Sequence, residues 1–125
     1  MFEGSPRTML HSLDIIRSLA METLVWPGHE YAKENVCFSL SVDQKNEKLQ
    51  EKVNWIYAQR RDRLPTCPST IKEERLYNPF LRTSEAAVLR NLNLRVEEGR
   101  APNDEIRAKA LAAIRKKKNE YGAKL

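Results

Sequence analysis

The segment Thr23-Leu24-Val25-Trp26-Pro27-Gly28-His29 constrains the architecture of this chain more than any other. Its short apolar, β-rich run, stopped by Pro-Gly, predicts a buried β-strand that ends at a turn. A lone strand leaves backbone N–H and C=O groups unpaired, and the rest of the sequence barely supplies a partner strand. We therefore expect one leftover strand in a mostly helical chain that is part of a larger architecture.

Helical patterns occupy most of the remaining sequence. Ser5-Pro6 reads as an N-cap followed by proline at the first helical position, and the apolar spacing after it predicts a helix over residues 6–19. The prolines in residues 64–69 predict an irregular segment. The same patterns predict further helices over residues 30–42, 47–63, 70–78 and 84–94, with a capping box of Thr70 and Glu73 and with Ser84 as a cap. The last predicted helix runs from Asn103 to a C-terminal cap at Gly122. Its apolar stripe consists of Ile106, Ala110, Leu111, Ile114 and Tyr121.

Length and composition narrow the class of protein. The 125 residues are enough for one small domain, and no apolar run approaches the roughly 18 residues of a membrane span. Cys37 and Cys67 make no disulfide framework, which favours a reduced intracellular setting. The first residues have no signal-peptide pattern. We expect a cytoplasmic protein without membrane contact, and a mitochondrial location stays open if residues precede Met1.

Positive charge is concentrated at the end of the chain. The net charge is +5: residues 107–125 carry +6, from seven basic residues and one acidic residue, and residues 1–106 carry −1. A local basic cluster suits a small anionic ligand as well as it suits nucleic acid. Because no aromatic residues are interleaved with the cluster and no recognition motif is present, we expect no nucleic-acid partner.

Three side chains are candidates for a functional site. His29 follows the strand, where side chains point into ligand crevices, although local context favours a histidine packed at a strand-to-helix junction. Arg115 and Lys118 share one helix face and can grip a carboxylate, although by themselves they also fit a solvated basic face. With two histidines and no paired metal motif, the sequence contains no complete metal site.

Four sequence blocks occur in a specific order and spacing: Phe2-Glu3-Gly4-Ser5, Thr23 to Tyr31, Pro68-Ser69-Thr70 with Glu73-Glu74, and Tyr77-Asn78-Pro79-Phe80-Leu81-Arg82. Together they resemble glyoxalase II, the hydroxyacylglutathione hydrolase family of binuclear metal thioesterases, over nearly the entire chain. Two variants, Trp-Pro-Gly-His and Thr-Cys-Pro-Ser-Thr, look closest to the branch that contains the paroxysmal nonkinesigenic dyskinesia protein.

The resemblance implies a division of the chain and a set of roles. Residues 1–29 would be the tail of a metallo-β-lactamase-like domain, and residues 30–125 a helical glutathione-binding C-terminal domain. His29 matches a metal ligand, Tyr31 matches a tyrosine that hydrogen-bonds glutathione, and Arg115 and Lys118 match the pair that holds the glycine carboxylate. The complete family enzyme uses two divalent metals, zinc or iron, to hydrolyse S-2-hydroxyacylglutathione to a 2-hydroxy acid and glutathione in methylglyoxal detoxification.

The sequence lacks two features of the family pattern that bear on its function. The motif Thr-His-x-His-x-Asp-His is absent, and Phe2 lacks the hydroxyl that some members place there for the ligand. We expect the substrate-binding part of the enzyme, inactive as a truncated chain, binding no metal stably and docking on a metallo-β-lactamase-like domain. A truncated gene model, a splice product and an expressed fragment all remain open. The alternative is a non-catalytic helical interaction module that docks on a partner protein.

Overall fold

The chain is mostly helical, as the sequence predicts. The computed structural model describes residues 4–97 and 99–123, so Phe2 and Glu3 of the first sequence block lie outside the described residues. The elements, in chain order, are α1 (Pro6–Arg17), β1 (Leu24–Val25), α2 (Ala32–Val42), α3 (Glu47–Arg61), β2 (Ser69–Thr70), α4 (Ile71–Tyr77), the 3₁₀-helix η1 (Pro79–Leu81), α5 (Ala86–Asn91) and α6 (Asp104–Ala123).

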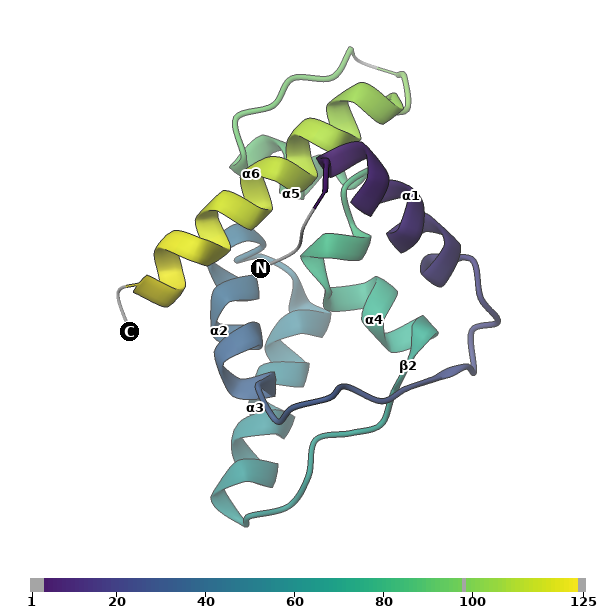
Figure 1. Cartoon of the computed structure of the whole chain (residues 1–125). Helices are drawn as coiled ribbons and strands as arrows, with labels where there is room; N and C mark the ends of the chain where they lie inside the picture. Colours follow the sequence, from purple (N-terminus) through teal and green to yellow (C-terminus); the bar gives the residue numbers. More distant parts are fainter. Residues whose placement is uncertain (1–3, 98, 124–125) are drawn as a thin grey trace.

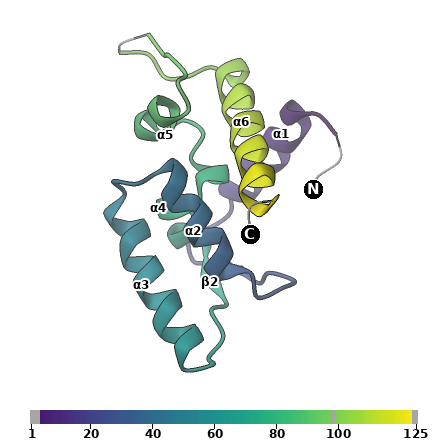
Figure 2. The same cartoon turned by 90° about the vertical axis from the view of Figure 1, so that its left-hand side faces the viewer.

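The helices pack as two pairs joined by α4. Helices α2 and α3 run antiparallel as a hairpin, and α1 lies against the N-terminal half of α6 (Figures 1 and 2). Helix α4 lies between the pairs, where it contacts both α3 and α1. No helix in the described part of the chain is long and apolar enough to cross a membrane.

The core follows the predicted apolar stripe of the last helix. Ala110, Leu111 and Ile114 of α6 are fully buried. Leu111 packs with Leu10 of α1, whereas Ala110 and Ile114 join a cluster that includes Phe38 of α2. Helix α6 is therefore the element that connects α1 to α2.

The predicted lone strand has a partner within the chain. β1 pairs antiparallel with β2, with Leu24 opposite Thr70 and Val25 opposite Ser69. The expectation that residues 64–69 are wholly irregular is therefore wrong at Ser69. The strand is also not buried, since Leu24 is 55% and Trp26 66% exposed. β2 pairs with one edge of β1 over two residues, and the side chains on the outer face of β1 stay exposed to solvent.

Helix α1 ends two residues before the predicted position 19, and α3 and α5 also end earlier than the sequence predicts, both for the same backbone reason. After α3, Arg63 takes a left-handed conformation with φ of 58°, and Leu64 N–H donates to the carbonyl of Gln59 at 2.7 Å. After α5, Asn93 has φ of 60°, and Leu94 N–H donates to Leu89 at 2.9 Å. These bonds from the sixth residue back to the first close a helix end.

Of the predicted caps at Ser5, Thr70, Ser84 and Gly122, the first two are present in the structure and the last two are not. The Ser5 and Thr70 hydroxyls accept hydrogen bonds from the backbone N–H groups three residues later, as predicted. Ser84 does not cap α5, because the helix begins one residue later and Glu85 occupies the N-cap position. Gly122 does not end α6, because the helix continues to Ala123.

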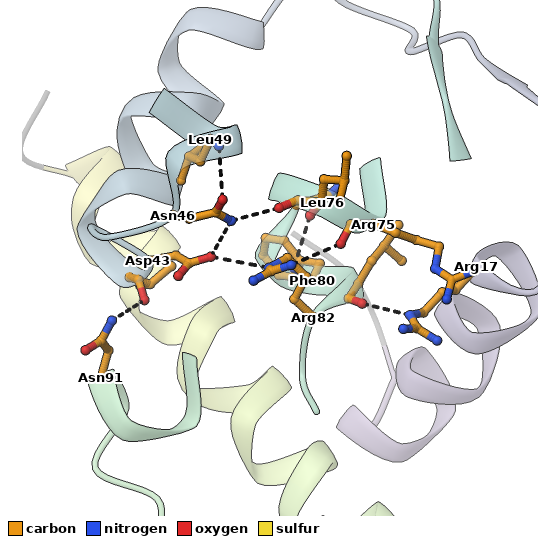
Figure 3. Close-up of polar contacts among 12 residues, drawn as sticks. Arg17, Asp43, Asn46, Leu49, Arg75, Leu76, Phe80, Arg82 and Asn91 are labelled. Carbon is orange, nitrogen blue, oxygen red and sulfur yellow. Dashed lines mark hydrogen bonds and ion pairs between the residues drawn. The ribbon is translucent and has the colours of Figure 1, made fainter. Parts of the chain in front are cut away.

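A buried carboxylate joins four segments of the fold. Asp43, which follows α2 and is 2% exposed, accepts hydrogen bonds from Asn46 Nδ2 at 2.9 Å and from Arg82 Nε at 3.3 Å (Figure 3). Asn46 also caps α3 through Leu49 N–H at 3.2 Å, and Arg82 donates to the carbonyl of Arg75 in α4 at 3.2 Å. The network therefore fixes α2, α3, α4 and the segment after η1 relative to one another.

Replacing Asp43 by Ala should lower the free energy of unfolding by about 3 kcal/mol, because the substitution leaves the Arg82 guanidinium buried without its counter-ion. Urea denaturation followed by circular dichroism measures this loss. Asp62→Ala is the matched control, because the Asp62 carboxylate pairs with Arg61 on an exposed surface and should contribute little. Equal losses in the two variants would contradict a structural role for the Asp43 network.

Candidate functional site

One pocket brings together residues from both ends of the chain. It has a volume of about 460 Å³ and lies among α1, β1, α2, α4 and α6. Pockets of this size hold small molecules in many proteins. Its walls are largely apolar and include Leu13, Ile16, Val25, Val36, Phe38 and Phe80.

Three of the four predicted site residues line this pocket. His29 enters from the segment after β1, and Arg115 and Lys118 enter from α6, one helical turn apart. Both cations are partly buried, so the reading of this pair as a fully solvated basic face does not hold. Carboxylates are bound more strongly by such groups than by exposed cations, because less solvent screens the charge.

Lys118 occupies the most distinctive electrostatic environment of the three. Its Nζ lies 5.4 Å from the centroid of the Phe38 ring, in the range of a cation–π contact. Partial burial lowers the pKa of Lys118 below its ordinary value; Glu34 opposes this effect and Arg115 reinforces it. An anionic ligand in the pocket would favour the protonated ammonium.

Tyr31 lies beside the pocket and does not line it. Its ring stacks on His29 with centroids 5.1 Å apart and planes 20° apart, and Tyr31 is 57% exposed. His29 is exposed as well, so it is not the packed junction histidine that local sequence context favours. The stacked pair instead forms an aromatic rim at the edge of the pocket.

Glu74 is a pocket residue that sequence reasoning did not single out as a site residue. Its carboxylate accepts hydrogen bonds from Ser69 Oγ at 2.6 Å, Tyr77 Oη at 3.2 Å and Asn78 Nδ2 at 3.0 Å. Burial raises the pKa of the Tyr77 hydroxyl, and the Glu74 charge adds to the effect. The spacing of Glu74, Tyr77 and Asn78, three and four residues apart, was the available sequence signal.

The described residues do not form the metal centre that the family resemblance implies. Nowhere in residues 4–97 and 99–123 do three His, Cys, Asp or Glu side chains come together in a way that could hold a metal ion. A catalytic zinc ion usually takes three protein ligands, and His29 offers one imidazole.

Comparisons with known proteins assign the chain to one group. The family model described as "Hydroxyacylglutathione hydrolase C-terminus" matches residues 30–121. The chain is 37% identical over 121 residues to a hydroxyacylglutathione hydrolase of Bartonella quintana (strain Toulouse), covering 97% of this chain and 45% of that protein. It is 48% identical over 88 residues to a Synechococcus sp. (strain JA-3-3Ab) protein of the same name, covering 70% and 35%. The chain thus spans less than half the length of these curated relatives.

Lys118 should lose its proton at a lower pH than a free lysine side chain, because burial disfavours the charged ammonium. Reductive ¹³C-methylation of the lysines followed by an NMR pH titration measures this pKa, and Lys118→Arg identifies the signal. A Lys118 signal that titrates as in a free lysine would contradict the partly desolvated environment.

Proposed function

This chain belongs to the hydroxyacylglutathione hydrolase family, and on that premise we propose that it supplies the glutathione-binding part of such a thioesterase. The reaction would convert an S-2-hydroxyacylglutathione and water to a 2-hydroxy acid and glutathione. The observation that carries the proposal is the position of Arg115, Lys118 and His29 around one pocket.

The chemistry of glutathione matches the pocket. The tripeptide carries two carboxylates, and Arg115 and Lys118 supply two cations on one helix face. Arginine binds a carboxylate through a two-pronged fork, and lysine adds a mobile point charge. We propose that this pair holds the glycine carboxylate and that Tyr31, at the aromatic rim, hydrogen-bonds the tripeptide backbone.

His29 would face the reacting end of the substrate. In the proposed complete enzyme His29 is one ligand of a site for two divalent metals, zinc or iron, which lower the pKa of a bound water. The remaining ligands would come from a metallo-β-lactamase-like domain, of which residues 1–29 are the proposed tail and residues 30–125 the helical neighbour. This chain by itself would therefore bind the glutathione moiety without hydrolysing the thioester, in a proposed cytoplasmic setting.

An exposed apolar surface supports docking on such a domain. Ile15, Leu19, Leu24 and Trp26 are all more than 40% exposed and lie within one short segment at the end of α1 and around β1. Large exposed apolar side chains gathered in this way are typical of an interface. The alternative of a non-catalytic interaction module is not favoured, since the relatives that match are named as hydrolases.

Isothermal titration of the chain with S-lactoylglutathione tests the binding role. Arg115→Ala should weaken binding about tenfold or more, because hydrogen bonds to charged groups contribute about 1.5–3 kcal/mol. Lys118→Gln should weaken binding several-fold. The affinity of the unsubstituted chain for S-lactoylglutathione should fall as pH rises, because Lys118 loses its proton. Lys117→Gln removes the same charge from an exposed neighbouring position and is the matched control. Equal effects of the Lys117 and Lys118 substitutions would contradict the proposal, because the ligand would then be attracted by the general positive charge of the helix and not bound in the pocket.

Hydrolysis of S-lactoylglutathione by the same preparation, supplemented with zinc or iron, tests the separation of binding from catalysis. We expect ligand binding without measurable loss of the thioester absorbance, because one imidazole does not assemble the metal site. Turnover by this chain would refute that separation and would require a metal site built from residues assigned other roles here.

A further inference from the structure

We propose that a second pocket, lined by Arg17, Arg75 and Arg107, is a binding site for a phosphate group. It lies where the end of α1, α4 and the start of α6 meet the segments before α5 and α6, and its volume is about 350 Å³. Ser18, Ser84 and Pro102 complete most of its lining. Among the residues that the structure describes, none lines both this site and the proposed glutathione pocket.

The three guanidiniums are close enough to repel one another. Arg17 and Arg75 lie side by side in Figure 3, although they belong to different helices. Burial lowers the pKa of Arg17, and the positive charges of Arg75 and Arg107 lower it further. An anion bound among the three side chains would replace this repulsion with attraction.

Within the described lining of the pocket, arginines outnumber carboxylates. Asp14 is the acidic residue among the described residues that line the pocket, and it is engaged by Arg107, whose Nη1 donates to Asp14 Oδ2 at 3.0 Å. Asp104 pairs with the same arginine, and Glu85 lies near Arg17, both outside the lining. The described lining therefore holds three arginines and one carboxylate, and two further carboxylates lie just outside it.

Arg17 and Arg75 both have donors to spare. A guanidinium carries five N–H donors. Arg17 uses Nε to bond the carbonyl of Leu81 at 3.0 Å, and Arg75 Nη1 lies 3.6 Å from Met21 Sδ. The remaining Nη groups can form the paired N–H···O contacts that arginine makes with phosphate. Ser84, which is exposed, adds a hydroxyl-bearing side chain to the lining.

The surroundings favour a phosphate on a small molecule over a nucleic acid. A neighbouring pocket shares Ser84 and Pro102 with the proposed phosphate site. Its lining adds Arg90, Arg95 and Arg100, of which Arg100 pairs with Glu97 at 3.0 Å, so it extends the positive potential that attracts an anion. No aromatic side chain is among the described residues that line either pocket. Single-stranded nucleic acids are typically held by stacking on such side chains. The chemistry therefore points to inorganic phosphate or a phosphomonoester.

Titration of the ¹⁵N-labelled chain with inorganic phosphate, at ionic strength matched with sodium chloride, tests the site. The backbone amides of Ser18 and Ser84 should shift on binding. Arg75→Gln should weaken phosphate binding about tenfold, since it removes one charged pair of donors. Arg75→Lys, which keeps the charge without the fork, should give a smaller loss. Arg61→Gln, a surface arginine of α3, is the control and should leave binding unchanged.

The same titration distinguishes this site from the glutathione pocket. Phosphate binding should persist in Lys118→Gln, and S-lactoylglutathione binding should persist in Arg75→Gln. Loss of phosphate binding in Lys118→Gln but not in Arg75→Gln would overturn the proposal and leave the glutathione pocket intact.

Glycerol phosphate in a parallel titration separates the two sources, since tighter binding than inorganic phosphate identifies a phosphomonoester. Tighter binding of a short single-stranded oligonucleotide would also overturn the proposal, in favour of a nucleic-acid surface.

Discussion

The ion pair between Asp43 and Arg82 is the constraint from which the arrangement of the helices follows. A buried carboxylate is costly without a partner, so the turn after α2 and the segment after η1 must meet in one geometry. Asn46 extends that geometry to the start of α3, and the carbonyl of Arg75 extends it to α4. Because α2 contributes Phe38 and α4 contributes Glu74 to the proposed glutathione pocket, the walls of that pocket are positioned by a polar network outside its lining.

The parts of the fold that depend on neighbouring residues were predictable from the sequence, and the parts that depend on distant ones were not. The caps at Ser5 and Thr70 follow from local hydrogen-bonding chemistry, and the buried face of α6 follows from its periodicity. The partner of β1 was missed because a two-residue strand at Ser69 carries no pattern of its own. The helix ends at Arg63 and Asn93 were missed because a left-handed residue that is not glycine leaves little trace in composition.

The two sites differ in how much of each the sequence disclosed. Arg115 and Lys118 could be paired from spacing, because residues three apart share a helix face, but only the fold shows that His29 reaches the same pocket. The pocket proposed for phosphate left no sequence signal, since Arg17, Arg75 and Arg107 come from three separate helices. Arg17 and Arg75 lie in residues 1–106, whose net charge is −1. Charge counted along a sequence does not describe charge gathered on a surface.

Helix α6 serves both pockets, with Arg107 near its start and Arg115 and Lys118 near its end, while its apolar face is fixed in the core. Successive residues of an α-helix are rotated by about 100° around its axis. A single inserted or deleted residue between Arg107 and Arg115 would therefore turn one group of cations away from its pocket while the core held the other in place. A change in the length of the loop before α6 would not rotate either group of cations relative to the other. Family members that keep both sites should vary in length in that loop and keep the number of residues between these two arginines constant.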